Sequence, residues 1–167
     1  MDWYALFVKT GKEDLVQQWL RIYFNESILS TIIPQRRLME RKGGKVKQVL
    51  KKMFPGYIFF HTEMNMETYY MVQKIPHVIR ILKTGEYYTK IAEDEMVCIL
   101  KLLDHEGVVD YSKIYIFNSK IFIKSGPLKG MEGIIIAVDK RKNRVKVLVN
   151  FMGVPKPIDL GIEVLRN

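Results

Sequence analysis

The sequence of 167 residues predicts an α+β domain at residues 1–104 and a small all-β domain at 118–167, joined by a linker at 105–117. Two observations support this division. Segments typical of strands and helices alternate up to about residue 104, which suits helices packed on one face of an antiparallel sheet. Beyond that point short strands follow one another closely, separated by Gly, Pro and Asn turns, as in a small barrel.

Hydrophobic spacing places the elements of the first domain. Strands are expected at 3–9, 27–40 and 54–61, and helices at 13–24, 65–75 and 92–106. The segment 77–91 is expected to form two strands joined by a turn at Thr84-Gly85. Apolar residues at helical spacing predict the buried faces of two of these helices. In the first helix they are Leu15, Trp19, Ile22 and Tyr23. In the last helix they are Met96, Ile99, Leu100 and Leu103.

The second domain and one loop of the first are defined by their glycines. The segment 40–52 (ERKGGKVKQVLKK) has Gly43-Gly44 at its middle and is interpreted as a basic hairpin or a flexible loop. Short strands are expected in the second domain at 121–123, 133–138, 144–152 and 158–165. No helix is expected after residue 120.

The glycine-rich stretch 124–139 (KSGPLKGMEGIIIAVD) raises the question of a nucleotide-binding loop. A P-loop needs G-x-x-x-x-G-K-[ST] between a strand and a helix, because the helix N-terminus holds the phosphates. Here the spacing is different, no Lys-Ser or Lys-Thr follows, and the next residues are strand-like. We therefore expect Gly126, Gly130 and Gly133 to form tight turns between barrel strands, with Pro127 fixing its own φ.

The sequence offers little for catalysis. The single cysteine, Cys98, lies among apolar residues of an expected helix and has no base partner nearby in the sequence. The three histidines, at 61, 77 and 105, lack the spacing of a metal site. The acids at 93–95 fit the first turn of a helix, where its dipole favours them. We expect no enzymatic activity, no metal and no cofactor, although a triad assembled in space would escape such a search.

Composition points to the cytoplasm. One cysteine allows no internal disulfide, and the N-terminus lacks the basic lead and long apolar run of a secretory signal. No stretch approaches the roughly 18–20 apolar residues of a membrane span, so no membrane partner is expected.

The net charge of +9 is concentrated in two stretches. Residues 36–52 hold eight basic residues and one acid, and residues 120–146 hold eight and two. Such an excess favours a polyanion, although a run of lysines is often only a solvated surface. Four cations crowd one expected turn of the barrel: Lys140, Arg141, Lys142 and Arg144. Small barrels often bind nucleic acid through such turns, and Phe122 and Phe151 nearby suit either base stacking or the core.

Several motifs in order resemble the NusG family of transcription elongation factors. They are WYALFVKTGKED at the start, FPGYIFF in the middle, IPHVIRIL, and IFIKSGPLKGMEGIIIAV near the end. The resemblance covers nearly the whole chain. It implies a ferredoxin-like NusG N-terminal domain, followed by a KOW motif that opens a five-stranded SH3-like barrel. The lysine-rich loops and the FMGVPKPIDL ending are most similar to the LoaP-type specialised paralogues, which are antitermination factors.

The resemblance also implies a docking site for RNA polymerase. The family's aromatic contacts to the clamp helices of the large catalytic subunit correspond here to Phe54, Pro55, Tyr57 and Phe59. Large aromatic surfaces suit this role, although alternate residues of such a strand also fill a core. A second contact, to the gate loop, corresponds to Thr68, Tyr69 and Tyr70. The hairpin at 41–52 would lie near upstream DNA.

For the barrel, the resemblance implies a second partner. In the general elongation factor this is the termination factor Rho or a ribosomal protein, and in the LoaP-like subgroup it is an RNA hairpin in the nascent transcript. Ten basic residues against four acids from residue 115 onward favour RNA, bound mainly through phosphates and shape. The expected nucleic-acid contacts are Lys124, Lys129, Lys140, Arg141, Lys142, Arg144 and Lys146, with Arg41, Lys42, Lys45 and Lys47 of the hairpin.

The sequence therefore predicts an antitermination and elongation factor that suppresses pausing and termination, acts on the nucleoid during transcription, and is not an enzyme. Three alternatives stay open. One is a general NusG-like factor whose barrel binds Rho or a ribosomal protein. A second is a ribosome-associated KOW protein that binds RNA and never contacts polymerase. The third is a small nucleotide-dependent enzyme.

Overall fold

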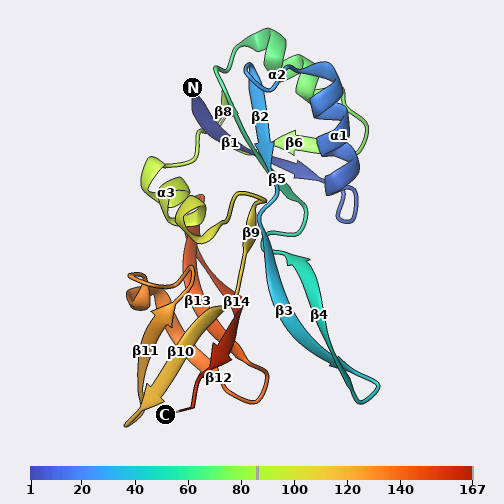
Figure 1. Cartoon of the computed structure of the whole chain (residues 1–167). Coiled ribbons are helices and arrows are strands. Elements are labelled where there is room, and N and C mark those ends of the chain that lie inside the picture. The colour runs from blue at the N-terminus through green and yellow to red at the C-terminus, as the bar shows by residue number, and fades with distance from the viewer. Residues whose placement is uncertain (86, 167) are drawn as a thin grey trace. The chain divides into compact units, whose positions relative to one another are not determined.

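A computed structural model describes residues 1–85 and 87–166, excluding the side chain of Tyr87 (Figure 1). Its contacts group the chain into two compact units. The first unit is Met1–Ile33 with Phe54–Met96, and the second is Pro34–Met53 with Val97–Asn167. Within the described residues, three α-helices and a larger number of strands confirm the α+β class. This grouping differs from domains divided at 104 and 118, which stay a prediction because packing does not establish which segments fold alone.

The first unit is built on a four-stranded antiparallel sheet with the order β2-β5-β1-β6. Its strands are β1 (Asp2–Val8), β2 (Leu29–Ile32), β5 (Tyr57–Thr62) and β6 (Val78–Ile81). Its helices include α1 (Glu13–Tyr23) and α2 (Met66–Gln73), and a small ribbon joins β7 (Lys83–Thr84) to β8 (Tyr87–Tyr88). Val16 of α1 and Val72 of α2 pack in the same core as Ile58 of β5. Both helices therefore cover one face of the sheet, as predicted.

The buried face of α1 differs from the prediction. Val16 and Leu20 are fully buried, and Phe24 just beyond the helix continues their line at a spacing of four residues. The predicted residues Leu15, Ile22 and Tyr23 are exposed instead, Ile22 to 72%. The prediction was wrong because α1 carries apolar residues on two stripes, and helical spacing alone does not say which one faces the sheet.

The helix α3 (Glu93–Leu102) also needs a correction to its buried face. Met96, Ile99 and Leu102 are buried, whereas the predicted Leu100 is exposed. Leu103, also predicted to be buried, is only partly covered and lies just after the helix. The buried side of α3 is therefore defined by residues three apart, Met96, Ile99 and Leu102, and not by residues four apart.

The second unit contains a five-stranded sheet with the order β11-β10-β14-β13-β12. Its strands are β10 (Ser112–Phe117), β11 (Lys120–Ser125), β12 (Ile135–Asp139), β13 (Arg144–Phe151) and β14 (Val154–Val164). Neighbours are antiparallel except β10 and β14, which are parallel. β10 occupies the segment expected as a linker, so the sheet begins earlier in the chain than the sequence indicates. Val145, Val147 and Val149 alternate inward on β13 and form part of the core.

A long hairpin also belongs to the second unit (Figure 1). β3 (Gln35–Lys42) and β4 (Lys45–Lys52) pair antiparallel across Gly43-Gly44, and β9 (Val108–Val109) pairs parallel with the start of β3. Of the two interpretations of this segment, hairpin or flexible loop, the hairpin is confirmed. The single strand expected at 27–40 is instead two strands. Pro34 lies in the break between them, where its missing N–H costs no ladder hydrogen bond.

The glycine-rich stretch 124–139 forms turns as predicted at its first glycine. Gly126 has a φ of +104°, and a Cβ there would lie 2.6 Å from the Cα of Ser112. Both facts require glycine, and the Ser112 hydroxyl accepts the backbone N–H of Leu128 at 3.0 Å beside it. Gly133 is different, because it lies in a single turn of 3₁₀ helix, η1 (Glu132–Ile134), with open space around it. The expectation that this region has no helix was therefore wrong by that one turn.

Candidate nucleic-acid interface

The basic turn between β12 and β13 is shaped by its own backbone. The Asp139 carboxylate accepts the N–H of Lys142 at 3.1 Å, and Asn143 adopts a positive φ of +54°. The carbonyl of Asn143 then accepts the N–H of Ile162 in β14 at 3.0 Å, which fixes the base of the turn to the sheet. An acid and an asparagine at these places are typical of tight turns. The turn therefore presents the side chains at 140–142 to solvent.

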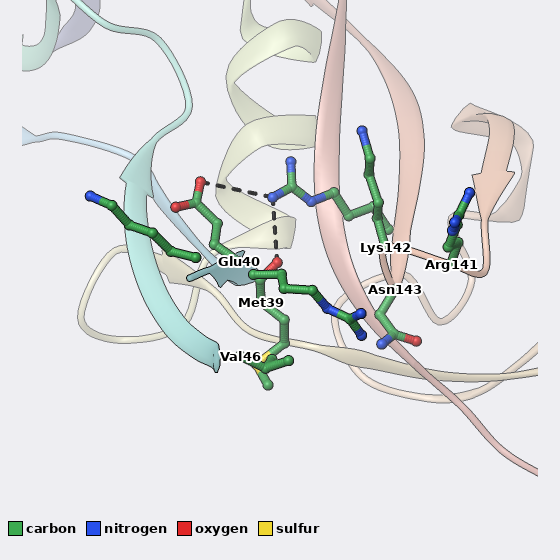
Figure 2. Close-up of a pocket in the computed structure, with 9 residues that line it drawn as sticks. Met39, Glu40, Val46, Arg141, Lys142 and Asn143 are labelled. Atoms are coloured by element: carbon green, nitrogen blue, oxygen red, sulfur yellow. Dashed lines mark hydrogen bonds and ion pairs between the residues drawn. The ribbon is translucent and has the colours of Figure 1, made fainter. Parts of the chain in front are cut away.

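This turn and the β3–β4 hairpin line one groove within the second unit (Figure 2). The groove has a volume of about 590 Å³. Its lining residues are Met39, Glu40, Arg41, Lys42 and Val46 from the hairpin, and Arg141, Lys142, Asn143 and Arg144 from the turn and β13. Five of these are cations and one is an acid, which leaves a net charge of +4 (5 − 1). The two basic stretches, about 90 residues apart in sequence, thus contribute to a single surface.

Arg144 joins the two walls of the groove. Its Nη2 lies 3.9 Å from the Glu40 carboxylate and donates to the Met39 carbonyl at 3.4 Å, as the dashed lines of Figure 2 show. Its Nη1 lies 3.8 Å from the carboxylate of Asp159 in β14. Only 21% of the side chain is exposed. Although the sequence places Arg144 with the free cations of the turn, its charge is already shared between two acids.

Glu40, which lines the groove, is held as a carboxylate. Lys51 on the neighbouring strand donates to it and forms an ion pair with it. The hydrogen bond from Lys51 is the main reason that the pKa of Glu40 lies below its usual value, and the charges of Lys51, Arg144 and Lys42 act in the same direction. Glu40 therefore stays ionised and offsets part of the surrounding positive charge.

The hairpin packs closely on β14 at the base of the groove. The Arg36 guanidinium donates from Nη1 to the Asp159 carbonyl at 2.6 Å. Gly161 lies against the backbone of Arg37, where a side chain would collide with the Arg37 carbonyl oxygen and the Tyr111 ring. Burial lowers the pKa of Arg36, but the group stays charged at any ordinary pH. These contacts hold β3 beside the barrel strands.

A second hollow of about 570 Å³ is also lined by the basic turn. Arg141, Lys142 and Arg144 line both hollows, so the turn borders each of them. Lys146, which the sequence assigns to the interface, lies here with its Nζ 3.8 Å from Asp159. Among the residues that the structure describes, no ion pair is formed by Lys140, Arg141 or Lys142. These three cations are available to an anionic ligand.

The remaining expected nucleic-acid contacts occupy other places. Lys45 and Lys47 are exposed on β4. Lys124 and Lys129 line a separate hollow beside β11, where the Lys129 ammonium donates to the Ile123 carbonyl at 2.9 Å. Phe151 is buried, whereas Phe122 is half exposed. The structure therefore places five of the eleven expected cations around the first groove and adds Lys140 and Lys146 at the second hollow. The other four lie on β4 or beside β11.

The residues expected to contact polymerase are divided by burial. Phe54 and Phe59 are buried with their rings edge to face at 5.4 Å. Pro55 is exposed, and Tyr57 is half buried against Phe7, with ring centroids 5.2 Å apart. Among this first group, only Pro55 and Tyr57 present accessible surface in this structure.

The second expected polymerase contact lies at the start of α2. Asn65 caps this helix by accepting the N–H of Thr68 at 2.8 Å, and Thr68 is buried. Tyr69 is half buried, and its hydroxyl accepts from the Gln73 side chain at 3.2 Å. Tyr70 is 55% exposed, so it is the member of this group best placed to contact another molecule.

Sequence reasoning missed the acids and the amide that organise the groove. Glu40 was noted only as a charge, and Asp159 and Asn143 were not assigned to the site. Asp159 pairs with Lys146 in the β13–β14 register, and this register places the acid beside the two basic residues at 144 and 146. A turn signal at Asn143 was available in the sequence, but strand register was not.

Other chemistry is sparse in the part of the chain that the structure describes. Burial raises the pKa of the Cys98 thiol, so this half-buried cysteine favours its neutral form. No group of three or more His, Cys, Asp or Glu side chains in residues 1–85 and 87–166 is arranged to hold a metal ion. Within the same residues, no helix has the length and apolar character needed to cross a membrane.

Comparisons with known proteins agree with this fold. Residues 1–100 match the family described as "Transcription termination factor nusG". The "Transcription termination/antitermination protein NusG" of Rickettsia prowazekii (strain Madrid E) is 28% identical over 99% of this chain and 90% of its own length. The protein of the same name from Haemophilus influenzae is also 28% identical, over 95% of this chain and 89% of its own length. A solved structure, "Domain interaction in Thermotoga maritima NusG", has a TM-score of 0.61 at 24% identity and covers 96% of this chain and 93% of its own.

Proposed function

We propose, from the premise that the chain belongs to the NusG family of transcription factors, that it is an antitermination and elongation factor that binds RNA polymerase and nucleic acid. Its N-terminal domain would bind the clamp helices of the large catalytic subunit and suppress pausing and termination. Its basic barrel would bind a hairpin in the nascent transcript. The observation that carries the nucleic-acid part is the groove with five cations and one acid, lined by both basic stretches.

The distribution of charge supports a polyanion as the ligand of this groove. Glu40 and Asp159 neutralise cations that hold the structure together, whereas Lys140, Arg141 and Lys142 project into solvent with no ion pair among the described residues. Closely spaced unpaired cations repel one another, and an anionic ligand relieves this repulsion. A phosphate backbone supplies negative charges at the required density.

The surface is better suited to binding an RNA hairpin through its backbone than to reading the base sequence of a duplex. No α-helix projects from the turn, and side chains do not reach base edges in the deep A-form major groove. Contacts to phosphates and ribose hydroxyls from two walls of a groove suit shape recognition. This mode agrees with a LoaP-type factor, whose partner is structured RNA, more than with a factor whose barrel binds Rho or a ribosomal protein.

Polymerase binding is supported by the exposed aromatic surface near the expected positions. Pro55, Tyr57 and Tyr70 offer accessible surface, and tyrosine is enriched at interfaces because it combines a large ring with a polar tip. Phe54 and Phe59 are buried, so they would reach a partner only after the residues over them move. We therefore expect the exposed members to contribute most to the first encounter.

Binding of the full-length chain to an RNA hairpin, measured across a range of salt concentrations, tests the nucleic-acid part. The slope of log K against log salt should change by roughly −0.7 to −0.9 for each phosphate that is neutralised. The double substitution Arg141→Glu with Lys142→Glu should weaken binding and flatten this slope. Lys9→Glu with Lys74→Glu changes the net charge equally at exposed lysines outside the groove, and should have a much smaller effect. Absence of binding at low salt refutes the proposal.

Retention of purified RNA polymerase by the full-length chain tests the other part. Tyr57→Ala and Tyr70→Ala should each reduce retention while leaving RNA binding unchanged. Ile79→Ala serves as a control, because Ile79 is an exposed apolar residue of the same unit outside the expected contacts. Equal retention of the parent chain and both tyrosine variants would show that the docking surface is wrongly assigned. Retention of Rho or a ribosomal protein in place of RNA would favour the general elongation factor.

A further inference from the structure

The outer face of β10 and β11 carries exposed aromatic rings that the groove does not use. Phe117 is 58% exposed and Phe122 is 50% exposed, and Tyr115 is partly exposed beside them. The register pairs Tyr115 with Phe122 and Phe117 with Lys120, so the three rings share one face. The alternate residues Ile114 and Ile123 point inward and are buried. Packing in the core explains why Ile114 and Ile123 are apolar, but it does not explain why three aromatic rings lie on the exposed face.

Lysines alternate with the rings on this face. Lys120 and Lys124 lie on either side of Phe122 along β11, and both are exposed. The ammonium of Lys124 lies 6.0 Å from the centre of the Tyr115 ring, within reach of a cation–π contact. A hollow of about 400 Å³ beside Phe122 is lined by Tyr115, Lys124, Lys129 and one acid, Glu132. Flat apolar surface and positive charge are therefore interleaved.

We propose that this face is a stacking platform for unpaired bases of RNA, an inference that rests on the proposed function of the barrel. Nucleic-acid bases have planar apolar faces on an anionic backbone, which matches exposed rings flanked by lysines. A purely apolar peptide would leave the lysines without partners, and an acidic peptide without aromatic residues offers no planar group to stack on the rings. Charge and shape together select a single-stranded polyanion with aromatic faces.

The platform lies close to the basic turn within the five-stranded sheet. β10 runs parallel to β14, and β13 runs antiparallel to it, so the β10–β11 and β12–β13 turns lie at the same end of the sheet. Only β14 separates β10 from β13, which corresponds to about 10 Å along a sheet with strands about 4.8 Å apart. One RNA can therefore place duplex phosphates at the turn and one or two unpaired flanking bases on the platform.

The test compares RNA strands that differ only in their bases. The full-length chain is titrated with a uridine dodecamer, with an abasic strand of equal length, and with a fully paired RNA hairpin. The uridine strand should bind more tightly than the abasic strand. Phe122→Ala should weaken uridine binding by about five- to 150-fold, the usual range for the loss of one base–ring stack. It should leave abasic and hairpin binding, and the salt slope of each, unchanged.

Two further variants separate stacking from folding. Phe122→Trp keeps a ring at this position, so it should restore uridine binding, and its indole fluorescence should be quenched when a base stacks on it. Ile136→Ala removes an apolar side chain of similar exposure, 53%, from another strand of the same sheet and should have no effect. Unchanged uridine binding in Phe122→Ala would overturn the platform and point to a protein ligand for the rings. Equal affinity for uridine and abasic strands would also overturn it.

This outcome is distinguishable from failure of the proposed function. If the hairpin binds with a steep salt dependence and Phe122→Ala has no effect on any strand, only the platform is wrong. If the parent chain binds no hairpin even at low salt, the proposed function of the barrel fails.

Discussion

Gly161 provides a direct test of the groove, because its missing side chain allows β3 to lie against β14. A Cβ at this position would collide with the backbone carbonyl of Arg37 and lie 2.6 Å from two ring carbons of Tyr111. The first contact is with backbone, which does not rotate away as a flexible side chain would. The φ of Gly161 lies outside the left-handed region, so Gly161→Ala adds no backbone strain. Any effect of this substitution comes from the collision.

The expected magnitude follows from overpacking. Adding one methyl group to a close-packed site that cannot relax costs about 1–3 kcal/mol. For a chain of this size, that corresponds to a fall in Tm of about 2–12 °C, taking roughly 2–4 °C for each kcal/mol. The alternative response is that the hairpin moves away from β14, which lowers the cost but opens the groove. Either response is measurable, and both require that β3 and β14 touch.

Thermal unfolding and a distance measurement distinguish the two responses. Spin labels at Val46→Cys and Lys142→Cys, in a Cys98→Ser background, report across the groove that both positions line. The distance distribution should be narrow in the parent and broader in Gly161→Ala if the hairpin moves. Gly133→Ala is the matched control, because a Cβ there meets nothing within 4 Å. If Gly161→Ala matches this control in both Tm and label distance, the packing of β3 on β14 is wrong.

Two further predictions test the corrected helix face and a local turn. Leu20→Ala should lower the free energy of unfolding by about 2–5 kcal/mol because Leu20 is fully buried. Ile22→Ala should change it by less than about 0.5 kcal/mol because Ile22 is exposed. Denaturant unfolding followed by tryptophan fluorescence compares the two variants, and equal losses would contradict the assignment of the buried face. Asp104 accepts the N–H of Val108 at 3.0 Å and of Glu106 at 2.8 Å, and these bonds hold its pKa below the usual value. The carboxylate therefore contributes stability that is complete above the unfolded pKa of about 3.9 and is lost as pH falls through the lower folded pKa. Asp104→Asn should remove this acid-sensitive part, and identical pH–stability curves for parent and variant would refute it.

Local patterns were sufficient for most elements of the fold. The turn at Gly43-Gly44, flanked by residues able to form strands, identified the β3–β4 hairpin as one of two options, because two consecutive glycines tolerate the positive φ values of a tight turn. The break between β2 and β3 at Pro34 and the choice of the buried stripe in α1 were not predicted. The helix carries Leu15 and Ile22 outside and Val16 and Leu20 inside. Composition does not show which of the two apolar stripes of α1 is buried, since this depends on which side of the helix packs against the sheet.

For a related reason, the sequence did not predict that the two basic stretches line one groove. Arg41 and Arg141 lie 100 residues apart in sequence, and nothing in either stretch indicates that they line one groove. Their proximity depends on the packing of β3 against β14, which in turn depends on the lack of a side chain at Gly161. A single glycine in a strand does not by itself indicate a close approach of another backbone, because glycine also occurs at bulges and at positions where it only destabilises the strand.

The acids explain why a count of basic residues is a poor guide to this interface. Arg144 and Lys146 share Asp159, and Arg144 also shares Glu40 with Lys51, so these three cations are part of the structure that holds the groove. A cation already paired with a carboxylate gains less from a phosphate than an unpaired one, because binding must first replace the existing partner. The salt dependence of RNA binding should therefore reflect the unpaired cations of the turn and hairpin, and be smaller than the eight basic residues of either stretch would imply.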